Sequence, residues 1–372
     1  MRPLQLHSLS LRALSCALLF SASAADTWYV DDDAPNDPGP GDPTLSDALE
    51  DGSALRPFDS VQEALNAAAS GDEVVLADGL YTGLGNRELS LGGKTLLVRG
   101  ENGSATSVID CEEQGRAFDL AGSLDVLTLR GLTIRNGLAR AGGALRMLAG
   151  SSLTVEQCQL ESCTSFTHGG ALYSRDSFPI LRGSRLSQNL ARGSHGGAAY
   201  VRGGGLAVRN CLIDRNSCST TGGGVYVDSC LAALDGCTFA DNLAQGFGGA
   251  LVSDWSTTQI RGSVLWGDEA GLLVGPEIAA FHSTFGAAWC DVEGDLGLGT
   301  SSLQSAFGWD LSNSSLDPLF VDPLAGDYHL DASSPCIDSG DPSYVPEPGE
   351  LDIDGEARIQ SSFVDRGADE RP

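Results

Sequence analysis

The sequence predicts an all-β fold, a parallel β-solenoid with three short strands in each coil, and two features of the chain indicate it. The first is a pair of adjacent glycines that returns after 27, 27, 26 and 26 residues. A fixed period in this range is typical of stacked repeats, in which neighbouring coils bury their apolar faces against each other. The pairs are Gly142-Gly143, Gly169-Gly170, Gly196-Gly197, Gly222-Gly223 and Gly248-Gly249.

The second feature is the spacing of apolar residues between the glycine pairs. They recur two or three positions apart, which indicates short strands broken by bends and not a helix. Two inward columns hold Leu129, Val155, Leu181, Val208 and Leu234, and Ile134, Leu160, Leu186, Ile213 and Phe239. A turn column holds Cys163, Asn189, Asn216 and Asn242. Stacked Asn side chains can hydrogen-bond from coil to coil, so we expect an Asn ladder there.

These repeats resemble a known family. The glycine pairs alternate with Leu186-x-x-Asn189, Ile213-x-x-Asn216 and Phe239-x-x-Asn242, a pattern similar to the repeats of polymorphic outer-membrane proteins. More broadly, the chain resembles secreted right-handed parallel β-helices of the pectin-lyase-like class over nearly all of residues 27–370. The resemblance implies a right-handed β-helix. It does not select an activity, because this fold hosts lyases, hydrolases and adhesins.

The ends of the chain differ from the repeats. Residues 1–25 combine two arginines, a short apolar run and small residues, which predicts a secretory signal and an extracellular or outer-surface location. Residues 26–72 form a lead-in segment with a short capping helix, whose start is marked by a capping box of Ser60 and Glu63. Residues 73–315 form the β-helix, and residues 316–372 form an irregular C-terminal cap or small module.

Charge excludes some partners and leaves one cofactor open. With 22 basic and 50 acidic side chains, the formal net charge is −28, which disfavours nucleic acid and anionic membranes. No apolar run is long enough to span a membrane, and no feature specifies an oligomeric state. Asp352, Asp354 and Glu356 occupy alternate positions with a glycine among them, an arrangement that fits a calcium loop as well as an ordinary polar turn.

The cysteines predict one disulfide. Ten cysteines become nine when the signal is removed, so at least one stays unpaired within the chain. Cys218 and Cys230 flank one glycine-pair bend and are the expected disulfide. Cys211 and Cys237 share an inward column on adjacent coils, at a separation that allows a bridge, although reduced cysteines there also serve as small core residues, which we favour.

An aromatic column is the first candidate binding surface. Strand alternation places Tyr173, Tyr200 and Tyr226 in one outward row, about 4.8 Å apart. Such a row can form a platform for sugar rings, or it can stabilise the sheet through cross-strand contact alone.

A basic column is the second candidate. Arg182 and Arg209 are neighbours in an outward row, with Arg185 close by. Adjacent guanidinium groups repel each other unless an anion lies between them, and Arg recognises carboxylates in a bidentate manner. An acidic polysaccharide can supply those carboxylates, or chloride, Glu156 or water can satisfy the guanidinium groups instead.

Catalysis has no residue assigned to it. His168 and His195 share a turn column in which no acid repeats, and Glu156 and Asp235 lie three coils apart, about 15 Å by strand spacing. We therefore predict an exported binding or adhesion protein without catalysis, directed to a polysaccharide or a cell-surface glycan. The alternatives are a polysaccharide lyase or glycoside hydrolase of the pectin-lyase-like class, and a structural stalk.

Overall fold

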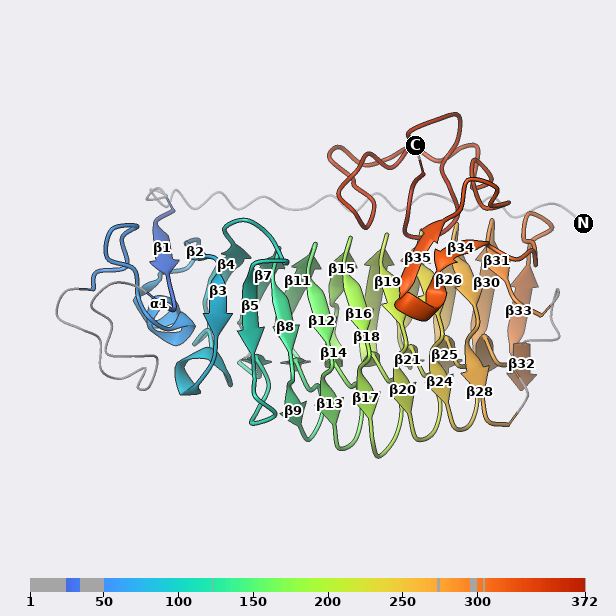
Figure 1. Cartoon of the computed structure of the whole chain (residues 1–372). Coiled ribbons are helices and arrows are strands. Elements are labelled where there is room, and N and C mark those ends of the chain that lie inside the picture. Colours follow the sequence, from blue (N-terminus) through green and yellow to red (C-terminus); the bar gives the residue numbers. More distant parts are fainter. Residues whose placement is uncertain are drawn as a thin grey trace, which may run out of the picture.

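The computed structural model describes residues 25–33, 50–122, 124–272, 275–294, 300–303 and 305–371. These residues form a right-handed parallel β-helix of about nine turns. The coils stack in sequence order, so the chain progresses steadily along one axis, while the C-terminal segment folds back against the side of the stack (Figure 1).

The coils present three sheets, as the sequence predicts. The long sheet contains two strands of each regular coil, and a single long strand, β18, joins the two. Its strands are β1 (Thr27–Val30), β2 (Glu73–Leu76), β4 (Thr95–Gly100), β6 (Phe118–Leu120), β7 (Val126–Arg130), β10 (Leu145–Met147), β11 (Ser152–Glu156), β14 (Leu172–Ser177), β15 (Ile180–Arg182), β18 (Ala199–Arg209), β21 (Val225–Asp228), β22 (Leu231–Asp235), β25 (Leu251–Asp254), β26 (Thr257–Arg261), β29 (Ile278–Phe281), β30 (Thr284–Ala288), β32 (Thr300–Leu303) and β33 (Ala306–Trp309).

The other two sheets are narrower. The second sheet contains β3 (Gly79–Tyr81), β5 (Ser107–Asp110), β8 (Thr133–Arg135), β12 (Gln159–Glu161), β16 (Arg185–Ser187), β19 (Leu212–Asp214), β23 (Thr238–Ala240), β27 (Val264–Trp266) and β31 (Asp291–Val292). The third sheet contains β9 (Leu138–Ala139), β13 (Thr164–Ser165), β17 (Leu190–Ala191), β20 (Ser217–Cys218), β24 (Leu243–Ala244) and β28 (Glu269–Ala270). A regular coil therefore has four strand segments on three faces, one more segment than predicted.

The register of the coils matches the predicted columns. Val155 pairs with Leu129 on one side and Leu181 on the other, and all three side chains are buried. Leu160 pairs in the same way within the second-sheet column. Since a parallel pairing keeps like residues above one another, the repeat in the sequence becomes a continuous apolar core.

The Asn ladder forms as predicted and ends on an acid. The side-chain amide of Asn189 donates to Asn216 Oδ1 at 2.9 Å, and that of Asn216 donates to Asn242 Oδ1 at 2.9 Å. Asn242 then donates to Asp268 Oδ1 at 2.7 Å. Every member is buried, so the ladder satisfies polar groups that would otherwise be unpaired in the core.

The two glycines of each pair serve different purposes. Gly169 has φ of 64°, a left-handed conformation that side chains disfavour. Gly170 has an ordinary φ, but a Cβ there would lie 2.1 Å from the carbonyl oxygen of Gly197 in the next coil. The first glycine makes the bend, and the second allows adjacent coils to approach.

A short helix lies at the N-terminal end of the stack beside β1 and β2, as Figure 1 shows. This helix, α1 (Val61–Ala67), is too short to cross a bilayer, and no other helix in the described ranges is long and apolar enough to do so. The predicted capping box is incomplete, because Ser60 Oγ donates to the Glu63 carboxylate and reaches no backbone amide. Asn86 of the 3-10 turn η1 (Leu84–Asn86) accepts from the Val61 N–H instead, at 2.8 Å.

The predicted disulfide is wrong. The nine cysteines that the structure describes are all free and buried. Cys218 packs with Ala191 and Ala244 in a small corner cluster, whereas Cys230 lies in the main core. The cysteines act as small core side chains, and burial raises the pKa of the Cys211 thiol to about 12.

The C-terminal segment, residues 316–371, docks along the flank of the stack (Figure 1). It includes an antiparallel pair, β34 (Phe320–Asp322) and β35 (Asp327–Leu330), joined through the 3-10 turn η2 (Pro323–Ala325). Ala368 N–H donates to Thr238 Oγ1 at 2.9 Å, and Arg366 donates to the Cys290 carbonyl at 3.1 Å. Because these partners lie in different coils, the segment covers the side of the β-helix and not merely its last turn.

Candidate functional site

The three tyrosines form the predicted column, but they are not an open platform. Tyr173 and Tyr200 stack with ring centroids 5.7 Å apart, and Tyr200 and Tyr226 stack at 5.4 Å. Only 5% of Tyr200 and 7% of Tyr226 is exposed. The expectation of an exposed ladder is therefore wrong for these two residues, and the column chiefly supports the sheet.

Two histidines cover the tyrosine rings. His168 lies 4.5 Å from the Tyr200 ring and His195 lies 4.5 Å from the Tyr226 ring, both measured between centroids. The Tyr200 hydroxyl donates to Asp228, and burial lowers the pKa of both imidazoles. The histidines therefore act here as packing residues, in agreement with the absence of an acid from their column.

The basic column is neutralised from within the chain. Glu347 of the C-terminal segment pairs with Arg209 and lies 3.8 Å from Arg182. Arg185 is held separately by a bidentate contact with the buried Asp214 at 2.8 and 2.9 Å. The sequence offered a ligand as one source of a carboxylate for Arg182 and Arg209. The structure shows that Glu347, 138 positions after Arg209, supplies it instead.

The predicted calcium loop does not form from the predicted residues. Asp352 is buried, and its Oδ1 accepts from the backbone N–H groups of Asp354 at 3.0 Å and Glu356 at 2.7 Å. Its side chain therefore closes a turn, while the Glu356 carboxylate accepts from Gln360. Only Asp354 of the predicted trio has its carboxylate at a cluster of possible metal ligands.

A cleft of about 340 Å³ lies between the C-terminal segment and the flank of the coils. This volume is within the range of small-ligand sites, roughly 300–1,000 Å³. Gln157 and Gln159 line it from the coils, and Tyr328 and His329 of β35 line it from the segment. Neither glutamine side chain has a hydrogen-bond partner among the described residues, so both amides are available to a ligand.

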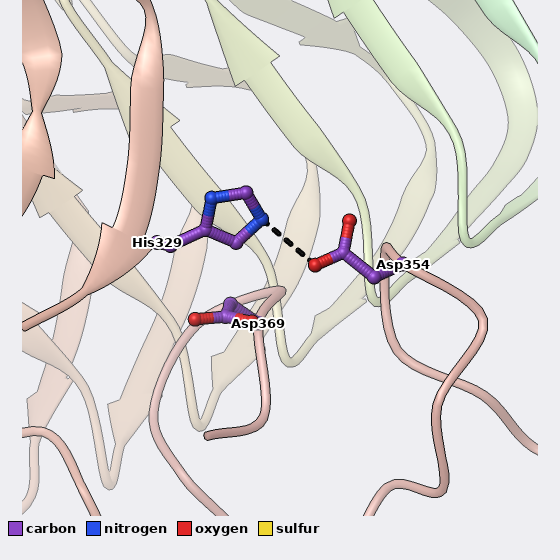
Figure 2. A group of neighbouring side chains, drawn as sticks. All are labelled: His329, Asp354 and Asp369. Atoms are coloured by element: carbon purple, nitrogen blue, oxygen red, sulfur yellow. Dashed lines mark hydrogen bonds and ion pairs between the residues drawn. The ribbon is translucent and has the colours of Figure 1, made fainter. Parts of the chain in front are cut away.

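His329 lies among carboxylates at the edge of this cleft (Figure 2). Its Nε2 is 2.7 Å from Asp354 Oδ2, and its Nδ1 contacts Asp327. Asp369 is the third member of the cluster, and the ligand atoms of His329, Asp354 and Asp369 all lie within 4.8 Å of one another. We call these three residues the His329 cluster.

The electrostatics of the cluster follow from these contacts. The hydrogen bond that His329 donates to Asp354 raises the pKa of His329 to about 9, because neighbouring carboxylates stabilise the imidazolium. The same bond lowers the pKa of Asp354, whereas burial raises the pKa of Asp369. In this state the His329 imidazolium is held between the carboxylates of Asp327 and Asp354.

Sequence reasoning missed His329 and Asp369. Both lie outside the repeats, so no column points to them, and they are 40 positions apart. Asp354 was found only because it sits in an acidic run. The structure brings the three together because the segment folds back on itself, with the Leu330 N–H donating to Asp369 Oδ2 at 3.0 Å.

The chain was compared with curated proteins and with solved structures, and only the solved structures gave matches. A search of curated proteins finds no match. Among solved structures, this chain is similar to the pectate lyase Pel9A. The two share 16% sequence identity with a TM-score of 0.47, and the match covers 95% of this chain and 98% of the lyase chain. A rhamnogalacturonan lyase has 10% identity and a TM-score of 0.37, covering 80% of this chain and 91% of its own. A pectin methylesterase from carrot has 11% identity and a TM-score of 0.37, covering 78% and 90%.

A family model also matches part of the chain. The model described as "Right handed beta helix region" matches residues 116–276, the stretch that contains the five glycine pairs. The matched stretch and the stacked coils agree, and the chain is a right-handed parallel β-helix protein.

Proposed function

We propose that the chain is an exported protein that binds carbohydrate at the cleft between its C-terminal segment and its coils, without turning the carbohydrate over. The observation that carries the proposal is the pair of unpartnered amides, Gln157 and Gln159, facing the His329 cluster across one open cleft. Each amide offers two donors and an acceptor, and carboxylates add acceptors. Sugar hydroxyls both donate and accept, so this set of groups matches them.

The charge of the protein favours a neutral glycan. The net charge of −28 repels polyanions at a distance. Arg182 and Arg209, the residues expected to attract uronates, already contact Glu347. An acidic polysaccharide would have to displace that carboxylate, whereas a neutral chain meets no such competition.

The spacing of the acids favours binding over hydrolysis. Glycosidases place their two carboxyl groups about 5–5.5 Å or about 6.5–9.5 Å apart, on opposite sides of the bond that is cleaved. The ligand atoms of Asp354 and Asp369 are within 4.8 Å of each other, and the ligand nitrogen of His329 lies within the same distance of both. Such an arrangement is suited to holding one group between the acids.

A glycan array probed with the full chain tests the proposal, followed by calorimetry on the best neutral oligosaccharide. Replacing Gln157 with Ala removes one hydrogen bond to the ligand and is expected to weaken affinity roughly five- to tenfold. Gln188→Ala is the matched control, because both glutamines are exposed at left-handed turn positions, with φ of 51° and 57°, and Gln188 lies outside the cleft.

Three results would overturn the proposal. The first is an array on which no glycan binds. The second is binding that both glutamine substitutions weaken equally. The third is turnover, seen as new reducing ends or unsaturated uronides. Turnover would support the alternative of a polysaccharide lyase or hydrolase.

A further inference from the structure

The His329 cluster joins three separate parts of the C-terminal segment. His329 belongs to β35, Asp354 to the loop that Asp352 closes, and Asp369 to the end of the chain (Figure 2). We propose that the cluster is a binding site for a divalent transition-metal ion of the zinc type, open to the cleft. The site does not depend on the proposed carbohydrate function.

The donor set selects the class of ion. One imidazole nitrogen and two carboxylate oxygens suit zinc and similar borderline ions, whereas calcium prefers six to eight oxygen ligands. Tetrahedral ligands about 2.1 Å from a metal are about 3.4 Å from one another. The cluster brackets this value, with 2.7 Å between His329 Nε2 and Asp354 Oδ2 and a largest separation of no more than 4.8 Å.

The surroundings of the histidine are those of a metal ligand. Its Nδ1 faces Asp327, so when an ion replaces the Nε2 proton, the imidazole keeps its Nδ1–H directed to Asp327 and presents the Nε2 lone pair to the ion. Carboxylate–histidine–metal arrangements of this kind orient the ring and strengthen the ligand. Asp327 is accordingly a positioning residue that does not itself bind the ion.

Asp354 and Asp369 each have a carboxylate oxygen that is available to an ion. Asp369 Oδ2 accepts from the Leu330 N–H, and Asp354 Oδ2 contacts the histidine. The second carboxylate oxygen of each has no hydrogen-bond partner among the described residues. Three protein ligands leave a further coordination position, as in open zinc sites, and this position faces a cleft lined by Gln157 and Gln159.

Calorimetric titration of chelator-treated full-length protein with zinc tests the proposal. We expect one ion per chain. Asp369→Asn keeps the shape of the side chain and should weaken binding at least tenfold, and Asp327→Asn should weaken it roughly 10- to 100-fold through the histidine. The control is Asp33→Asn, in the acidic run Asp31, Asp32 and Asp33, whose ligand atoms are similarly close.

Several results would contradict the site. Absence of stoichiometric zinc binding is one, and affinity that Asp33→Asn lowers while Asp369→Asn and His329→Gln do not is another. If a hundredfold excess of calcium displaces zinc, the assigned class of ion is wrong. Far-UV circular dichroism of each variant establishes that a lost affinity does not arise from a lost fold.

Discussion

Replacing Asp268 with Asn should make the β-helix more stable at alkaline pH. Asp268 occupies the rung of the Asn ladder after Asn242, where it accepts 2.7 Å bonds from the Asn242 side chain and backbone. It is buried beside Glu277, which is fully buried, and each acid has one carboxylate oxygen without a hydrogen-bond partner among the described residues. A shared proton between the carboxyl groups would satisfy both oxygens.

The size of the effect follows from the pKa of Asp268. Burial raises it from 3.8 to about 7, and burial also raises the pKa of Glu277. Because the folded state holds the proton more tightly, the stabilising contribution is complete below pH 3.8 and is lost as pH rises through 7. At 1.36 kcal/mol for each pKa unit, the loss is about 4 kcal/mol by pH 8.

Asn cannot ionise, so Asp268→Asn should recover much of this loss, about 2–4 kcal/mol at pH 8. By register, its amide would also continue the ladder, as Asn242 does in donating to the Ile213 carbonyl at 2.7 Å. Urea unfolding at pH 4.5 and pH 8 measures the difference, with the exposed neighbour Glu269→Gln as control. A variant that is less stable than the wild type at pH 8, or a gain that is equal at both pH values, would refute the reasoning.

Three further predictions concern the columns and the flank. Tyr200→Ala should lower the free energy of unfolding by about 3 kcal/mol in urea titrations, because a buried ring is lost. Tyr200→Phe should lower it by about 1 kcal/mol, because only the hydrogen bond to Asp228 is lost. An unchanged unfolding midpoint for the Ala variant would contradict the burial of the ring. Gly170→Ala should prevent normal stacking, since its Cβ meets the Gly197 carbonyl, and native-like thermal stability would disprove this. Glu347→Gln should increase proteolysis of residues 341–351, and a cleavage rate equal to wild type would show that its contacts with Arg182 and Arg209 do not hold the segment.

The coils were predictable because the same pattern of glycine pairs and apolar residues recurs in each of them. Each repeat shows the same alternation of inward and outward residues. Superposing the repeats therefore gives the register of Val155 and Leu160. The Asn ladder was predictable for the same reason. The fourth strand segment was not, because two-residue strands such as β13 leave too short a pattern to recognise.

The exposure of side chains was harder to predict. Alternation places Tyr200 outside the core correctly, but it carries no information on what covers the outer face. His168 packs against Tyr200 from a turn, and Glu347 reaches Arg209 from far along the chain. These contacts depend on turn geometry and on tertiary docking, which local periodicity does not encode.

The His329 cluster illustrates the same limit. The sequence offered Asp352, Asp354 and Glu356 because they alternate, yet Asp352 serves the turn and Glu356 contacts Gln360. The true neighbours of Asp354 come from distant positions. A non-repeating segment has to be folded before its ligands can be recognised.

The central claim is that ligand binding occurs at the cleft of the C-terminal segment and not on the tyrosine column. Hydrogen exchange with and without a bound neutral oligosaccharide tests it most directly. We predict new protection in residues 327–330 and 352–369, with little change in residues 172–177 and 199–204. Protection confined to the strands of the tyrosine column, with none in the C-terminal segment, would contradict the claim.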